Sequence, residues 1–183
     1  ISAETDRNLR ENKEFLSSII ENIPNMIFVK DPENLRFVQL NSAGEELLGY
    51  SRNDLIGKND FDFFPPEEAE FFITHDRAVL SGNVAIDISE EEILTRTKGK
   101  RILHTKKLPV FDESGKPKFL LGISEDITEQ KILEEERNKL KNHLEYLLGV
   151  TKTGIDIIDA DYTLMYVDPA WSRIYGDYTG KKC

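Results

Sequence analysis

The chain has 183 residues, of which 39% are hydrophobic and 32% are charged, a composition typical of one globular domain plus part of another. Its 34 acidic residues outnumber its 24 basic residues, and the resulting net charge of -10 argues against a nucleic-acid-binding surface. The apolar runs are far shorter than the ~20 residues that cross a bilayer, so we expect no membrane contact.

The ends of the chain and its cysteine content indicate its setting. The sequence opens Ile1-Ser2-Ala3-Glu4, without an initiator Met or a signal peptide, and we expect a piece of a longer protein. The one cysteine is Cys183, which excludes an internal disulfide and a cysteine-based metal cluster. We therefore expect a reducing, cytoplasmic setting.

Residues 1–23 predict an amphipathic helix. The segment contains neither Gly nor Pro, and Pro24 ends the helical pattern. Its apolar side chains share one helical face, which is formed by Leu9, Leu16, Ile20 and Ile23.

The segment from residue 26 to Gly82 predicts two strands followed by helices. Turn residues at 31–34 separate two β-prone runs, which favours a hairpin. Asn41 has the chemistry of an N-cap for a short helix that ends near Gly49. The strands are expected over 26–30 and 35–40, and the further helices over 51–55 and 66–82.

Three more strands are expected after Gly82. Turn clusters at 98–100 and 112–117 have the length that joins antiparallel neighbours. The strands are expected over 86–94, 101–111 and 118–127. The fold class is therefore α+β, with a five-stranded antiparallel sheet, short inserted helices and flanking amphipathic helices.

Residues 128–149 predict a charged connecting helix with leucines at coiled-coil spacing, namely Leu133, Leu140, Leu144 and Leu147. The acidic runs 90–92 and 134–136 are expected on solvated faces, because neither supplies the converging oxygens of a calcium loop.

An internal repeat follows the connecting helix. Residues 155–176 repeat the order of residues 27–49, and Asp168 falls where Asn41 fell. The second copy stops near Gly180, close to the position of Gly57 in the first copy. We therefore expect a complete unit over 24–127 and a truncated one over 150–183.

Three motifs, in this order, resemble a PAS domain. They are residues 41–50 with Gly57-Lys58, the helix ending at 76–82, and residues 122–128 followed by a charged helix. The Asp-Ile-Thr sequence of the last motif is similar to the junction where PAS domains pass into their output helix. The resemblance covers roughly residues 10–130 and, in truncated form, 145–183.

The resemblance implies a sensory module of a multidomain prokaryotic signalling protein. The parent is most often a sensor histidine kinase, and sometimes a diguanylate cyclase or a chemoreceptor-like protein. The module itself is expected to be non-catalytic, because the sequence contains no nucleotide-binding loop, nucleophile–base pairing or carboxylate dyad with supporting spacing.

The sequence argues against the two cofactors that the resemblance brings into question. Flavin-binding relatives carry a reactive cysteine where this chain has Asp60, and a carboxylate cannot add to a flavin as a thiolate does. We expect Asp60 instead to cap or flank the turn before Phe61. Haem-binding relatives use a histidine on the helix that ends here at Gly82, but His75 is about one turn out of register.

A small-molecule pocket between the short helices and the sheet is implied by the resemblance to ligand-binding PAS domains. Its candidate lining is Phe61, Phe64, Phe71, Phe72, His75, Leu103 and Ile123. The alternative is that the aromatic residues are core, where burial contributes ~1.5–3 kcal/mol each without any ligand. No residues are assigned to a metal, since neither His104 nor His143 has a second ligand at metal spacing.

Signal relay is assigned to Asp126, Ile127 and Thr128. The side chains of Asp126 and Thr128 can accept from open N–H groups at the helix start, and the same junction can act as a hinge.

A parallel homodimer is expected, because the apolar seams of the two flanking helices are narrow and the truncated unit lacks sheet partners. The interface is assigned to Leu9, Leu16, Ile20, Leu140, Leu144, Leu147 and Trp171. Two functions stay open, a sensor of a small-molecule or redox cue upstream of an output domain and a ligand-free dimerisation and relay module.

Overall fold

The computed structural model describes residues 3–151 and 155–182, which belong to two compact units. The first unit runs from Ile1 to Glu129 and the second from Gln130 to Cys183. Cys183, the one cysteine of the sequence, lies outside the described residues, as do residues 1–2 and 152–154.

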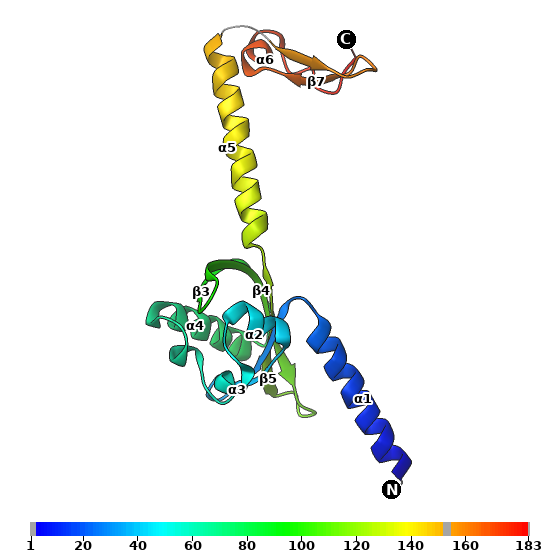
Figure 1. Ribbon diagram of the computed structural model, residues 1–183, viewed down its shortest axis with the longest axis vertical. Coiled ribbons are helices and arrows are strands. Elements are labelled where there is room, and N and C mark those ends of the chain that lie inside the picture. The colour runs from blue at the N-terminus through cyan, green and yellow to red at the C-terminus, as the bar shows by residue number, and fades with distance from the viewer. Residues whose placement is uncertain (1–2, 152–154, 183) are drawn as a thin grey trace. The chain divides into compact units, whose positions relative to one another are not determined.

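A five-stranded antiparallel sheet forms the first unit, in the order β2-β1-β5-β4-β3 (Figure 1). Its strands are β1 (Met26–Lys30), β2 (Phe37–Leu40), β3 (Ile86–Thr95), β4 (Gly99–Phe111) and β5 (Pro117–Asp126). Strand β1 pairs with both β2 and β5, so the first and last strands of the unit are neighbours. The predicted α+β class and the five-stranded antiparallel sheet are confirmed.

Helices precede the sheet and fill the connection between β2 and β3. They are α1 (Ala3–Asn22), α2 (Ser42–Leu48), α3 (Arg52–Leu55), the short 3-10 helix η1 (Asp60–Asp62) and α4 (Pro66–Gly82). Asn41 caps α2 by accepting from Gly44 N, and Gly49 ends it at a φ of 77°, which favours glycine.

The core lies between these helices and the inner face of the sheet. Its members are Met26, Phe28, Phe37, Leu40, Leu47, Leu48, Leu55, Phe72, Val79, Ile93, Leu103 and Leu120. Gly122 on β5 leaves space for the Phe28 ring, because a Cβ at this position would overlap that ring. The inner and outer faces are therefore distinct, and Ile123, next to Gly122, belongs to the outer face.

The repeat is visible in the hydrogen bonds of the second unit. The helix α5 (Thr128–Thr151) leads to β6 (Asp156–Ile158), β7 (Leu164–Val167) and α6 (Pro169–Tyr175). Asp168 Oδ2 accepts from Ile155 N at 2.7 Å, as Asn41 Oδ1 accepts from Ile27 N at 2.9 Å. The Leu164 N to Lys181 O bond, at 2.9 Å, likewise matches the Phe37 N to Lys58 O bond, also at 2.9 Å.

Candidate functional site

Five charged side chains are buried together between the helices and the sheet, and we call them the ion cluster. Lys30 on β1 donates from Nζ to Asp60 Oδ2 at 2.6 Å and to Asp76 Oδ2 at 2.7 Å. Lys107 on β4 has its Nζ 2.8 Å from Asp76 Oδ1 and 3.5 Å from Glu91 Oε1. Every one of these side chains is at most 4% exposed. The ion cluster therefore joins β1, η1, α4, β3 and β4.

The protonation equilibria of the ion cluster are shifted in different directions. Burial alone would raise the pKa of Asp76, but the ammonium groups of Lys30 and Lys107 lower it below its ordinary value. Burial raises the pKa of Asp60 above its ordinary value, because Lys30 offsets the loss of hydration only in part. Burial would lower the pKa of Lys30, but Asp76 and Asp60 raise it. Asp76 is therefore the ionised bridge, and Asp60 holds a proton more readily.

A cavity of about 30 Å³ lies beside the ion cluster. Its charged end is formed by Lys30, Asp60, Glu91 and Lys107. The rest of its wall is apolar and is formed by Met26, Phe28, Phe37, Leu48, Phe64, Phe72, Ile93 and Leu103. Since about 10–15 Å³ holds one water-sized group, the site is small and polar at one end only.

The structure brings three of the residues predicted to line a pocket to the wall of this cavity. Phe64, Phe72 and Leu103 line the cavity. Phe61 and Phe71 do not, because they are 51% and 43% exposed. His75 does not line it either, and its Nδ1 lies 2.8 Å from the carbonyl oxygen of Phe71 on its own helix. Ile123 is excluded because it lies on the outer face of the sheet, while the cavity lies against the inner face.

Two acidic residues have side chains in places that the sequence did not indicate. Asp60 flanks the turn at Phe61 as the first residue of η1 but does not cap it, because Asn59 supplies the cap through its Oδ1 and the Asp60 side chain turns inward to Lys30. Glu91 is buried rather than solvated, because a bulge in the β3–β4 pairing between Ile88 and Glu91 points it to the inner face.

Sequence reasoning missed the two lysines of the ion cluster. Their signal was the period-2 alternation of the strands, which places Lys107 on the same face as Leu103 and Thr105. Lys30 ends an apolar run and reads as the polar end of a strand, although its side chain is buried. Because lysine is seldom buried, strand alternation alone does not predict a buried lysine at these positions.

The predicted relay residues join β5 to α5 and also bond to β4. Ile127 N donates to Ile102 O at 2.9 Å, and Ile102 N donates to Thr128 Oγ1 at 2.9 Å. Asp126 Oδ1 accepts from Thr128 N at 3.0 Å. The Thr128 hydroxyl accepts from Ile102 N on β4 rather than from an N–H group of its own helix. The reason is register, since Leu103 pairs with Asp126 and brings Ile102 beside the junction.

Comparison with known proteins identifies the family. Residues 20–132 match the family described as the PAS fold. The chain belongs to the PAS fold family. A PAS domain of an HTR-like protein from Haloarcula marismortui has a TM-score of 0.56 and 23% identity, and the match covers 69% of this chain and 100% of that domain. This likeness shows the fold.

Two curated relatives of this PAS domain are larger proteins. The aerobic respiration control sensor protein ArcB of Escherichia coli (strain K12) is 32% identical over 122 residues, which is 66% of this chain and 15% of ArcB. The methanogenesis regulatory histidine kinase FilI of Methanothrix harundinacea (strain 6Ac) is 31% identical over 114 residues, which is 62% of this chain and 12% of FilI. The chain thus spans less than a fifth of either relative.

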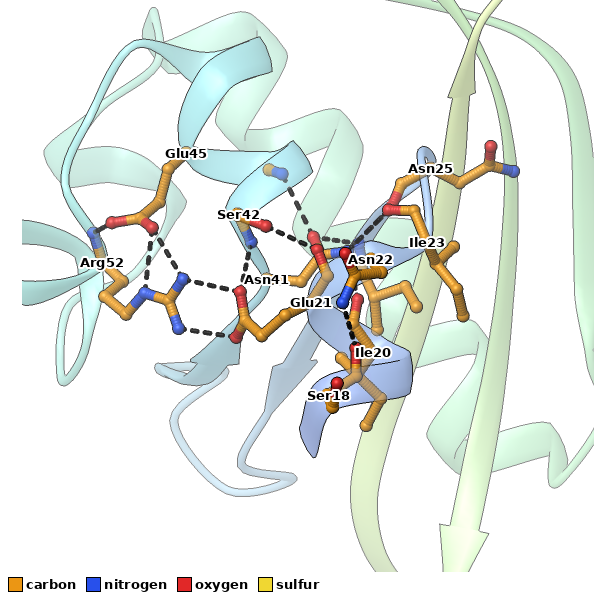
Figure 2. A network of polar contacts seen from close by, with 12 residues as sticks. Ser18, Ile20, Glu21, Asn22, Ile23, Asn25, Asn41, Ser42, Glu45 and Arg52 are labelled. Carbon is orange, nitrogen blue, oxygen red and sulfur yellow. Dashed lines mark hydrogen bonds and ion pairs between the residues drawn. The ribbon is translucent and has the colours of Figure 1, made fainter. Parts of the chain in front are cut away.

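Asn41 ties the end of α1 to the PAS core (Figure 2). Its Oδ1 accepts from Ile27 N and Gly44 N, and its Nδ2 points to three backbone carbonyls near the end of α1. These carbonyls belong to Ile20 at 3.1 Å, Ile23 at 3.4 Å and Asn25 at 2.9 Å. The side chain is fully buried, so it uses both its acceptor and its donors away from water.

A second link, which we call the arginine clasp, joins α1 to α2 and α3. Arg52 donates to Glu21 Oε1 at 2.7 Å and to Glu21 Oε2 at 2.9 Å, a bidentate pair (Figure 2). The same guanidinium donates to Glu45 Oε2 at 2.7 Å. Ser42 N also donates to Glu21 Oε2, at 2.9 Å. These side chains remain about one third exposed, so water and salt reach the arginine clasp.

The hydrogen bonds of the arginine clasp should give the Glu21 carboxyl an unusually low pKa. Hydrogen bonds from Arg52 lower the pKa of Glu21 from 4.5 to about 2, so the stabilisation is complete above pH 4.5 and is lost as the pH falls toward 2. A carbon-13 NMR titration of the Glu21 carboxyl should show this low midpoint, and Arg52→Gln should return it to about 4.5. A midpoint near 4.5 in the unaltered protein would mean that the clasp does not form.

Most residues assigned to a dimer interface are exposed in the single chain, namely Leu9, Leu16, Leu140, Leu144, Leu147 and Trp171, and Ile20 is half-buried.

Among the described residues, no helix has the length and apolar character needed to cross a membrane. The same part of the chain contains no group of three or more His, Cys, Asp or Glu side chains that could hold a metal ion.

Proposed function

We propose that this PAS domain is a cytoplasmic sensory module that detects a small-molecule or redox cue and relays it through α5 to an output domain. A sensor histidine kinase is the proposed parent, and the names of ArcB and FilI support this assignment. The module itself carries no catalytic step. Its task is to convert a change beside the ion cluster into a change at the start of α5.

One observation carries the proposal, which is that the cavity wall and the start of α5 share adjacent residues of β4. Leu103 lines the cavity and is only 1% exposed. Its neighbour Ile102 bonds through its N–H to Thr128 and through its carbonyl to Ile127. Because the interior is closely packed, a molecule that displaces Leu103 also displaces the backbone that holds the helix start.

The relay is tested by changing the volume of the cavity wall without adding a ligand. Leu103→Phe should increase amide exchange at Ile127 about tenfold, equivalent to about 1.4 kcal/mol of local opening. Leu55→Phe is the matched control, because Leu55 is equally buried but lies in α3, outside the cavity wall. Equal exchange at Ile127 in the two variants, after correction for global stability, would contradict a relay through β4.

A second candidate function is a ligand-free dimerisation and relay module, and the small size of the cavity favours it. About 30 Å³ accepts a molecule of only a few atoms unless the wall moves. The absorption spectrum and native mass of the purified chain separate the two functions. A stoichiometric bound species supports sensing, whereas a bare chain that still couples Leu103 to Ile127 supports the ligand-free relay.

A parallel homodimer through α1 and α5 is part of the proposal. The exposed leucines of α5 recur at coiled-coil spacing, and Leu140 is 61% exposed in the single chain. Trp171 and the apolar residues of β6 and β7 extend the surface that a second copy would cover.

The dimer predicts a mutation-sensitive mass in solution. Leu140→Asp should convert a dimer at tens of micromolar into a monomer, because it buries a carboxylate in an apolar seam. Asn142→Asp adds the same charge to an exposed position outside the predicted leucine seam and should leave the mass unchanged. Light scattering measures both, and a monomer mass in the unaltered chain would oppose the dimer.

A further inference from the structure

The ion cluster contains unequal numbers of positive and negative groups. Lys30 and Lys107 supply two ammonium groups, whereas Asp60, Asp76 and Glu91 supply three carboxyl groups, so the formal charge is 2 − 3 = −1. An uncompensated charge in a buried site is costly. The ion cluster therefore needs one more positive charge, either a proton or a bound cation.

Glu91 presents to the cavity an oxygen that lies within ion-pair distance of Lys107 but accepts no hydrogen bond from the described residues. Its Oε1 accepts no hydrogen bond from the described part of the chain, and the nearest ammonium, Lys107 Nζ, is 3.5 Å away. Lys107 lies closer to Asp76, at 2.8 Å. Buried acceptors nearly always have a donor. The unfilled oxygen thus indicates where a donor from outside the chain would bind.

The remaining wall of the cavity suits a cation better than an anion. The ammonium of Lys30 lies 4.8 Å from the centre of the Phe37 ring and 5.4 Å from that of Phe28. The ammonium of Lys107 lies 5.5 Å from the centre of the Phe72 ring. These rings already stabilise ammonium groups through their π faces. An anionic ligand would add to the excess negative charge, and an apolar ligand would leave Glu91 without a donor.

We propose that the cavity binds a small ammonium-type cation, either ammonium itself or a short primary amine, through the Glu91 carboxylate and the surrounding phenylalanine rings. The inference rests on the proposed sensory function and names the class of molecule that it detects. The volume of about 30 Å³ sets the size, since it holds one or two water-sized groups. Methylammonium, with two heavy atoms, is therefore the probe.

Binding of the cation is expected to release a proton. Burial raises the pKa of Asp60 whereas the two ammonium groups lower that of Asp76, so Asp60 takes up a compensating proton more readily than Asp76 when the cavity contains no cation. A cation beside Glu91 favours the ionised form of Asp60, so any proton held there passes to solvent and the ion cluster with its ligand carries no net charge. The charged groups that face this exchange are Lys30, Asp76, Glu91 and Lys107.

The proposal is tested by thermal unfolding of the whole chain with methylammonium chloride at pH 7. A saturable rise in Tm of at least about 3 °C is expected, whereas equal concentrations of NaCl, KCl or tetramethylammonium chloride should not produce it. Calorimetry in two buffers of different ionisation enthalpy should show up to one proton released for each cation bound.

Two neighbouring substitutions locate the site. Glu91→Gln should abolish the response to methylammonium, because it removes the carboxylate charge with which the cation pairs. Glu92→Gln is the matched control, because Glu92 is 61% exposed and pairs with Lys100, and it should keep the full response.

Several outcomes would overturn the proposal. They are a response shared by KCl, a response that survives Glu91→Gln, and an ion cluster that takes up only a proton. None of these outcomes contradicts the proposed sensory function, because the effect of Leu103→Phe on amide exchange at Ile127 is measured without any amine. Loss of that coupling together with intact methylammonium binding would instead leave a binding site without a relay.

Discussion

Asp76→Asn should lower the free energy of unfolding by about 3–5 kcal/mol, the cost of removing one partner from a buried ion pair. The carboxylate bridges Lys30 at 2.7 Å and Lys107 at 2.8 Å and is fully buried. The amide has the same shape but no charge, so two ammonium groups lose their shared anion. Urea unfolding followed by circular dichroism measures the loss.

Asp60→Asn is the matched control for this change. It should cost only about 1 kcal/mol, because Lys30 keeps Asp76 as its anion and an amide oxygen can still accept from Lys30 Nζ. Since the pKa of Asp60 is raised above 3.8, the unaltered protein loses stability relative to this variant as the pH rises through the folded pKa. Similar losses from both variants would show that Asp76 is not the bridge.

Asn41→Asp should destabilise the protein by about 2–4 kcal/mol and should loosen α1 first. The substitution keeps the acceptor for Ile27 N and Gly44 N but places a carboxylate oxygen against the carbonyls of Ile20 and Asn25. Donors become acceptors, and a buried charge appears without a counter-ion. Hydrogen exchange should therefore rise in α1 before it rises in β1.

Asn22→Asp is the control for Asn41→Asp, because it makes the same chemical change a few residues before the core. Asn22 Nδ2 donates to Ser18 O at 2.8 Å, and the contact is exposed to water (Figure 2). Its loss should lie within about 0.5 kcal/mol, as for most surface changes. Uniform exchange across α1 and β1 in Asn41→Asp would argue that Asn41 supports the whole domain rather than its link to α1.

The fold could be predicted from the sequence because its signals are local. Turn clusters, caps and period-2 alternation mark the strands and helices, and the order of motifs identifies the PAS resemblance. The repeat could also be predicted from the sequence. Asp168 and Asn41 occupy equivalent positions, and each accepts a hydrogen bond through a side-chain oxygen from the equivalent backbone N–H, of Ile155 and Ile27. The bulge before Glu91 could not be predicted in this way, because one extra residue in a strand has no distinct sequence signal.

The site was predicted less well because its parts meet only in three dimensions. Lys30 and Asp76 are 46 residues apart, and each looks like a surface residue within its own segment. The predicted pocket was instead built from aromatic residues. Adjacent residues of a helix point in different directions, so Phe72 of α4 faces the core whereas Phe71 is exposed. The charge pairs between β1, α4 and β4 can be recognised only once the fold has brought these elements together.

The different exposure of the ion cluster and the arginine clasp gives the domain two electrostatic systems that answer to different solution variables. Raising the ionic strength from 0.1 M to 1 M shortens the Debye length from about 10 Å to about 3 Å and weakens charge pairs that ions can approach. Mobile ions reach Arg52 and Glu21, which are 37% and 30% exposed, but not Lys30 and Asp76. Concentrated salt therefore weakens the arginine clasp more than the ion cluster, and the buried hydrogen bonds of Asn41 are the contacts of α1 that ionic strength leaves unchanged.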